Sequence, residues 1–162
     1  MPRRAVSMVT SLFAKPGIVF QPLVTSKCLE CPFFNACLGN LRPLVSYRVV
    51  GVRKHVVHCP ALAEDLITVE VEELPAKLVL SSRDVMPGAV VYYRRPSCDE
   101  GVEECTPVFI EEGERIRILR EIEKVGSGFS LVEVEFIDPP SPRIWLLARR
   151  KLLGRVAQQE SG

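Results

Sequence analysis

The 162-residue sequence lacks any uninterrupted apolar run that approaches the roughly 20 residues of a membrane-spanning helix. A mildly apolar stretch follows Arg3 and Arg4, but Lys15, Pro16 and Gly17 interrupt it, and no clear small-residue cleavage site comes after it. Neither a membrane span nor a secretory signal is indicated. We therefore expect a soluble, cytoplasmic protein with no membrane partner.

Motifs of the common enzyme classes are also absent. The sequence contains no phosphate-binding glycine loop, no dinucleotide fingerprint, no Gly-x-Ser-x-Gly and no His-Glu-x-x-His. Nothing in the sequence names a reaction, and a small-molecule substrate is not expected. Whether the protein is an enzyme stays open, with a non-enzymatic role favoured.

A marked excess of charge of one sign is missing as well. The chain has 21 basic and 20 acidic residues, so its bulk charge names no partner. Basic residues nevertheless gather toward both ends, while residues 100–114 are rich in glutamate. This asymmetry is typical of a polyanion-binding surface, although solvated helix and loop faces produce it too. The candidate polyanion-binding residues are Arg143, Arg149, Arg150, Lys151 and Arg155.

The most informative feature that is present is a group of cysteines. Cys28, Cys31 and Cys37 fall within ten positions, and Cys59 follows further along the chain. Clustered cysteines in the cytoplasm bind metal more often than they form disulfides. Thiolates are soft ligands that select zinc or iron–sulfur clusters over magnesium or calcium. We expect these four cysteines to hold a metal centre.

The spacing favours a [4Fe–4S] cluster, with zinc as the alternative. Four-cysteine zinc sites usually pair two Cys-x-x-Cys knuckles, but only Cys28 and Cys31 have that spacing here. The pattern from Cys28 to Cys37, with Pro32 and two aromatic residues inside it, resembles the cluster-binding segment of CRISPR-associated and recombination nucleases. No nuclease carboxylate core accompanies it, so the resemblance implies a cluster and not that activity.

Neighbouring residues could complete or tune such a centre. His55 or His58 could replace Cys59 in a zinc site, but successive strand residues point to opposite faces, so His58 points away from Cys59, which remains the expected ligand. Cations near in sequence could offset the charge of four thiolates: Lys27, Arg42, Arg48, Arg53 and Lys54. Apolar side chains could shield the centre from water: Phe33, Phe34 and Leu38.

A second, weaker signal is the pair Cys98 and Cys105, which lies in an acidic loop without a nearby histidine. Two thiolates cannot close a tetrahedral site alone. The pair therefore predicts either a disulfide, as in thermophile proteins, or part of a second metal site.

Hydrophobic periodicity predicts a mainly β fold, a small barrel or sandwich. Ile67, Val69 and Val71 alternate with polar residues, as in a strand with one wet face. Strands are expected at 6–13, 18–20, 45–57, 67–71, 78–80, 89–93, 108–110, 115–122 and 131–137. Pro32 and Gly39 bracket a short helix over 32–38. Frequent turns, without a strand–helix–strand rhythm, argue against a parallel sheet.

Three regions follow from this pattern. Residues 1–137 form the β-rich metal-binding domain, and 138–142 form a proline-rich linker. Residues 143–162 form a basic amphipathic helix and tail, with the helix ending at about Gln158. Its apolar positions are Ile144, Leu147, Leu152 and Val156.

Several short motifs, combined from Val9 to Val125, carry a family resemblance. They are Ala14-Lys15-x-Gly17, the first three cysteines, Tyr47-Arg48-Val49-Val50, Val52-Arg53, Cys59-Pro60, Cys98 and Cys105. This arrangement resembles an uncharacterised archaeal family of small cysteine-rich proteins, known by a placeholder number. The resemblance implies an archaeal, cytosolic origin and no activity. Members carry further cysteines in the second half, whereas residues 129–136 have none, so no second complete metal site is implied.

Two functions remain in view. The first is a non-enzymatic metal or iron–sulfur module that docks on RNA, the ribosome or transcription machinery, since small β-barrels with basic ends and structural metals recur there. The alternative is a redox protein that transfers electrons through a [4Fe–4S] cluster.

Overall fold

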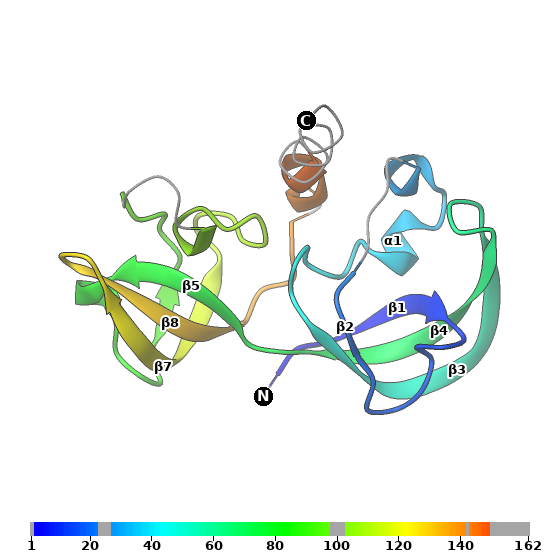
Figure 1. Ribbon diagram of the computed structural model, residues 1–162, viewed down its shortest axis with the longest axis horizontal. Helices are drawn as coiled ribbons and strands as arrows, with labels where there is room; N and C mark the ends of the chain where they lie inside the picture. Colours follow the sequence, from blue (N-terminus) through cyan, green and yellow to red (C-terminus); the bar gives the residue numbers. More distant parts are fainter. Residues whose placement is uncertain (1, 23–26, 98–102, 142, 150–162) are drawn as a thin grey trace, which may run out of the picture.

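Eight strands form two four-stranded antiparallel sheets in the computed structural model, which describes residues 2–22, 27–97, 103–141 and 143–149 (Figure 1). The expectation of a mainly β fold is therefore confirmed. Within the described residues, no helix is long and apolar enough to cross a membrane.

The first sheet carries the cysteine segment. It contains β1 (Arg4–Thr10), β2 (Val19–Phe20), β3 (Tyr47–Cys59) and β4 (Glu64–Glu73), in the order β1-β4-β3-β2. β3 and β4 form a long hairpin, and the sheet curls like half a barrel (Figure 1). Along β4, Val69 and Val71 are fully buried while Glu70 stays partly exposed, which is the alternation that the sequence predicts.

The second sheet follows directly from the first. It contains β5 (Ala76–Ser81), β6 (Val90–Tyr92), β7 (Arg115–Val125) and β8 (Phe129–Phe136), in the order β5-β8-β7-β6. β8 buries every second residue, which places Val132, Val134 and Phe136 in the core. The two sheets share one hydrophobic core cluster, although they lie beside one another in Figure 1.

One local expectation differs from the structure, and another is confirmed with shorter bounds. Residues 108–110 are not a strand, because the Phe109 carbonyl accepts a hydrogen bond from Arg42 Nη1 at 2.8 Å instead of joining a ladder. The short helix expected over 32–38 is present as α1 (Phe34–Cys37), and a 3₁₀ turn, η1 (Cys28–Glu30), precedes it.

The C-terminal helix is present, and its described part covers residues 144–149. Ile144, Trp145 and Ala148 are buried, whereas Leu147, which the periodicity assigned to the apolar face, is 53% exposed. The buried face of this helix is therefore the one that carries Trp145. The rest of the predicted helix, with Leu152 and Val156, lies outside the described residues, and the three-region division stays a prediction.

Candidate metal centre

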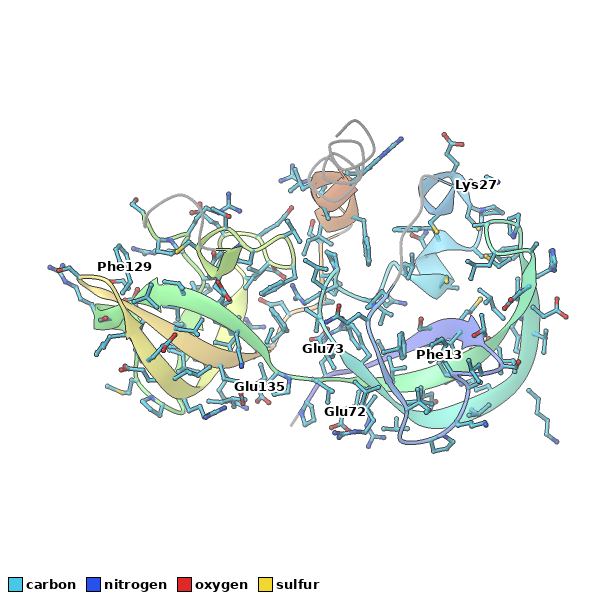
Figure 2. The ribbon with its side chains drawn as sticks, viewed as in Figure 1. Phe13, Lys27, Glu72, Glu73, Phe129 and Glu135 are labelled. Carbon is cyan, nitrogen blue, oxygen red and sulfur yellow. The ribbon has the colours of Figure 1, made fainter. Side chains whose placement is uncertain are left out.

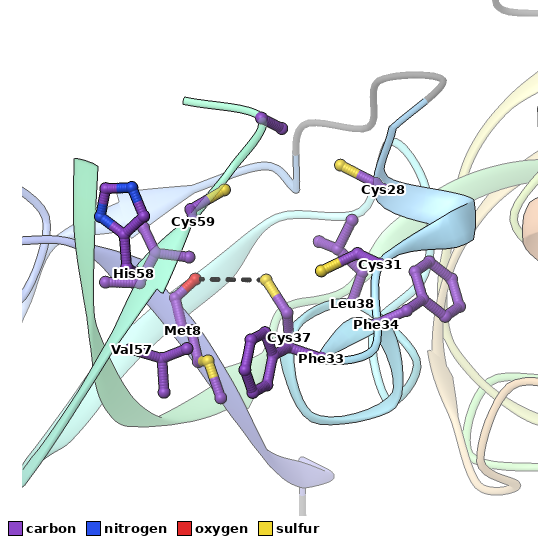
Figure 3. A pocket seen from close by; sticks show the side chains of 12 residues that line it. Met8, Cys28, Cys31, Phe33, Phe34, Cys37, Leu38, Val57, His58 and Cys59 are labelled. Atoms are coloured by element: carbon purple, nitrogen blue, oxygen red, sulfur yellow. Dashed lines mark hydrogen bonds between the residues drawn. The ribbon is translucent and has the colours of Figure 1, made fainter. Parts of the chain in front are cut away.

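The structure brings together Cys28, Cys31, Cys37 and Cys59. Cys28 begins η1, Cys31 directly follows it, Cys37 ends α1 and Cys59 ends β3. All four are partly buried and border one pocket. Figure 3 shows the four sulfurs around this shared space. The loop thus supplies three candidate ligands and the end of a long strand the fourth.

Local backbone geometry sets the first three positions. The Cys31 amide donates to the Cys28 carbonyl at 3.1 Å, which closes the Cys-x-x-Cys turn, and the Cys37 amide donates to the Phe33 carbonyl at 2.9 Å. The chain leaves α1 at Gly39, where a Cβ atom would lie only 2.8 Å from Asn35 Cα. Glycine allows this close approach, as its expected place at the helix end indicated.

The segment is tied to the first sheet beside the pocket. Ser7 Oγ donates to the Cys37 carbonyl at 2.6 Å, and the Cys37 thiol donates to the Met8 carbonyl at 3.8 Å (Figure 3). Both acceptor and donor residues lie on β1, which is the strand beside β4. These two contacts hold α1 against β1.

The electrostatics of the site suit a cationic occupant. The pKa of the Cys37 thiol is raised to about 11. Burial is the largest cause, and the charges of Cys28, Cys59 and Cys31 contribute the rest of the rise. Deprotonation of Cys37 is therefore disfavoured unless a positive centre lies beside it. The donor set thus fits a metal ion or an iron–sulfur cluster, both of which bind thiolates.

The lining of the pocket is otherwise mainly apolar. Phe33, Phe34 and Leu38 border it as the sequence analysis expects, and Met8 and Leu66 border it from the sheet. Phe33 is 42% exposed, so one wall of the site faces solvent. An apolar wall excludes water and influences the potential of a redox centre.

The two candidate occupants make different demands on the sulfurs. A tetrahedral zinc site needs each sulfur at about 2.3 Å from one ion. A cubane cluster is larger and spreads its thiolates over several irons. Within the described ranges, no three His, Cys, Asp or Glu side chains form a group that could hold a metal ion.

The two histidines take no place among the four sulfurs. His58 borders the pocket, but its ring turns to Asp65, with Nδ1 3.2 Å from Oδ1. His55 is exposed on β3 and does not border the pocket. Cys59 therefore has the better position for the fourth ligand.

The profile of the uncharacterised protein family UPF0179 matches residues 5–136. The chain belongs to this family. The UPF0179 protein of Pyrobaculum aerophilum is 30% identical over 145 residues, which cover 86% of each chain. That of Pyrococcus abyssi is 28% identical over 80% of this chain and 95% of its own. That of Archaeoglobus fulgidus is 29% identical over 76% of this chain and 86% of its own.

These UPF0179 relatives confirm the resemblance to an uncharacterised archaeal family. Their names describe no activity, ligand or partner. No solved structure matches the chain.

Other predicted site residues lie away from the cysteines. Cys105 is buried and disulfide-bonded, and Cys98 lies outside the described residues. Arg143 and Arg149 are exposed at the C-terminal helix. The remaining candidate polyanion-binding residues, Arg150, Lys151 and Arg155, also lie outside the described ranges.

Arg42 differs most from its expected role. Instead of facing the cysteines, its fully buried guanidinium contacts Glu114 at 2.8 Å and the Phe109 and Asp138 carbonyls. The expected charge compensation of the cysteine site by Arg42 is therefore wrong. Of the other cations expected to offset the site's charge, Lys27, Arg48, Arg53 and Lys54 are exposed and do not border the pocket.

Trp145 is the residue that sequence reasoning missed. Its Nε1 donates to the carbonyls of Leu38 at 3.0 Å and Leu41 at 2.9 Å, and its ring meets Phe34 edge-on. The sequence signal that could have found it is the presence of the single tryptophan in a basic helix. A buried indole needs both apolar packing and a hydrogen-bond acceptor, so it marks the helix face that packs on the protein.

Proposed function

We propose that Cys28, Cys31, Cys37 and Cys59 hold a [4Fe–4S] cluster, with zinc as the alternative, in a small barrel-like β module that is not an enzyme. The module docks on RNA, alone or within the ribosome or transcription machinery. The observation that carries the proposal is the placement of four cysteine side chains around one mainly apolar pocket. The cluster supplies a cross-link between the loop and β3.

The weakness of the loop by itself supports a structural role. η1 has three residues, and α1 has four, none of which is buried. Helices this short are unstable without tertiary contacts. A centre that joins this loop to the end of β3 contributes its binding free energy to folding.

Exposed arginines support docking on a polyanion. Arg143 and Arg149 lie on the exposed side of the C-terminal helix, whose other side is buried. Arg95 and Arg143 border the same cleft, which has a volume of about 530 Å³. Arginine is the preferred donor to phosphate oxygens. Glu111 and Glu112 also border the cleft, and Arg143 Nε lies 3.9 Å from Glu111 Oε1, so Arg149 on the exposed side of the helix is the arginine outside this acidic surrounding.

Electron transfer is the second candidate function. All four cysteines are partly rather than fully buried, and Phe33 at the pocket wall is half-exposed. A cluster this close to the surface exchanges electrons with a docked partner more readily than a deep one. A reversible redox step of the cluster supports this function, and a titration without one removes it.

Metal analysis of anaerobically purified protein tests the proposal. We expect about four irons and four labile sulfides per chain, as a [4Fe–4S] cluster contains. Zinc without labile sulfide would show that the site holds zinc and not a cluster. The absence of both iron and zinc would overturn the metal centre.

Binding of the whole protein to RNA or ribosomes tests the second part of the proposal, docking on RNA. The double variant Arg143→Gln/Arg149→Gln is expected to lower the slope of log affinity against log salt by about 1.4, since each single-strand phosphate contact contributes about 0.7. Lys77→Gln/Arg83→Gln removes the same charge from exposed positions of β5 and of the turn that follows it, and serves as the control. Equal slopes for the two variants would contradict docking through the helix.

A further inference from the structure

The C-terminal helix packs on the cysteine segment rather than on the main core. Leu38, Ile144 and Trp145 form a small buried cluster of their own, separate from the core that the two sheets share. Cys28, Phe34 and Cys37 are partly buried against this cluster. Two of the four cysteines therefore belong to the platform on which the helix rests.

Trp145 makes the connection specific. Its indole N–H is shared between the Leu38 and Leu41 carbonyls, at 3.0 and 2.9 Å, and both bonds are buried. The Phe34 ring meets the indole edge-on, with 6.3 Å between ring centroids and an angle of 87°. Phe34 and Leu38 also border the cysteine pocket. One face of each side chain thus meets the pocket and another meets the helix.

The platform is formed by the cysteine segment, which has few stabilising contacts of its own. None of the four residues of α1 is fully buried. Two hydrogen bonds, both made by Cys37, attach the helix to β1. Elements with few buried contacts open at low free energy. Loss of a cross-link between this segment and Cys59 therefore loosens Phe34 and Leu38 first.

We infer that occupancy of the cysteine site controls the docking of the helix at 144–149, and thereby the protein's affinity for single-stranded RNA. This inference rests on the proposed metal centre. With the site filled, Leu38 and Phe34 hold Trp145, and Arg143 and Arg149 are presented from a fixed surface. With the site empty, the helix loses part of its platform, and the arginines lose their shared orientation.

The coupling is graded rather than all-or-none. Leu41 is fully buried in the main core, and its carbonyl remains an acceptor for Trp145 whatever happens to the cysteine loop. Only the Leu38 and Phe34 contacts depend on the loop. Emptying the site is therefore expected to expose Trp145 partly and to weaken RNA binding without abolishing it.

Trp145 is the only tryptophan of the chain, so its fluorescence reports on the helix alone. The full-length protein is loaded anaerobically with zinc, or with iron and sulfide, and then stripped with a chelator. Acrylamide quenching and emission wavelength are measured in each state, with zinc as the load that does not absorb the emission. We expect stripping to raise the quenching constant at least about twofold, as local opening exposes the indole.

RNA binding is measured in the same samples with a labelled oligouridine. Stripping is expected to lower the salt slope by up to about 1.4, the value for two single-strand phosphate contacts. Trp145→Phe keeps a ring against Phe34 but loses both hydrogen bonds, so its RNA affinity is expected to respond less to stripping. Leu146→Ala, a truncation on the exposed face, is the matched control and keeps the full response.

The outcomes separate this inference from the proposal on which it rests. Metal that binds and is removed without a change in Trp145 quenching or in the salt slope would overturn the coupling and leave the metal centre standing. Protein that retains neither zinc nor iron would overturn both. Because the wild-type comparison uses no substitution, a misfolded variant does not affect this decision.

Discussion

The guanidinium carbon of Arg42 lies 4.0 Å from the centre of the Phe136 ring. Arg42 directly follows the cysteine loop, whereas Phe136 ends the last strand of the second sheet. The same guanidinium bonds both carboxylate oxygens of Glu114, at 2.8 and 3.2 Å. The segment that follows the cysteine loop is thus anchored in the other sheet.

A hydrogen-bonded chain continues from Arg42 into the first sheet. Its amide donates to Tyr47 Oη, which in turn donates to Glu73 Oε2, both at 2.7 Å. Glu73 ends β4, near the point where one sheet passes into the other (Figure 2). Arg3 closes the chain with two bonds to the Glu73 carboxylate. Burial and Glu73 together raise the pKa of Tyr47, which keeps its proton for this bond.

Arg42→Met is expected to lower the free energy of unfolding by about 3–5 kcal/mol, because it leaves the largely buried Glu114 carboxylate without its cationic partner. Denaturant unfolding measures the loss. The control is Arg53→Met, which breaks the exposed Arg53–Glu70 pair and is expected to cost less than about 1 kcal/mol. A loss for Arg42→Met that does not exceed the control would show that this ion pair does not join the sheets.

Cys59→Ser is expected to remove most of the iron or zinc, because the loop then loses its only cross-link to β3. His58→Ala is the matched control, since its ring turns to Asp65, and it is expected to keep the metal. Metal content per chain measures both. The reverse result, with metal kept by Cys59→Ser and lost by His58→Ala, would make the histidine the fourth ligand.

Asp138→Asn tests a pH-dependent contact at the start of the linker. The Asp138 carboxylate accepts hydrogen bonds from the Arg115 side chain at 2.8 Å and from the Arg115 amide at 2.9 Å. The side-chain bond first, and then the amide bond, hold the pKa of Asp138 below its usual range. A lowered folded-state pKa stabilises the protein above the unfolded pKa of about 4, and that stabilisation is lost as the pH falls through the folded value. The variant is therefore expected to melt earlier at neutral pH.

The difference between wild type and Asp138→Asn is expected to vanish as the pH falls below the lowered folded-state pKa and the wild-type carboxyl is protonated. Thermal melting across this pH range measures it. Asp84→Asn, in the exposed turn η2 (Ser82–Asp84), is the control. A melting difference that persists unchanged into strong acid would rule out the carboxylate as its source.

Thiol labelling tests the second cysteine pair. After metal removal, four cysteines are expected to react with iodoacetamide without reductant, and all six after reduction. Peptide mapping is expected to assign the two protected sulfurs to Cys98 and Cys105. Six reactive thiols without reductant would exclude the disulfide.

Much of the local structure follows from the sequence. Alternation of apolar and polar residues predicts β4 and β8, since a strand with one buried face must place every second side chain in the core. The cysteine spacing likewise predicts that Cys28, Cys31 and Cys37 lie on one loop. Predicted boundaries fail where a backbone group bonds a distant side chain, as at Phe109.

The sequence alone determined the strand pattern, the cysteine loop and the family. The tertiary structure decided where Arg42 and Trp145 act. Arg42 meets Glu114 across 72 positions, and Trp145 meets Leu38 across 107. Period and spacing carry information only about near neighbours, whereas buried polar groups take whichever partner the fold brings within hydrogen-bond distance. Packing therefore places the basic helix on the cysteine loop.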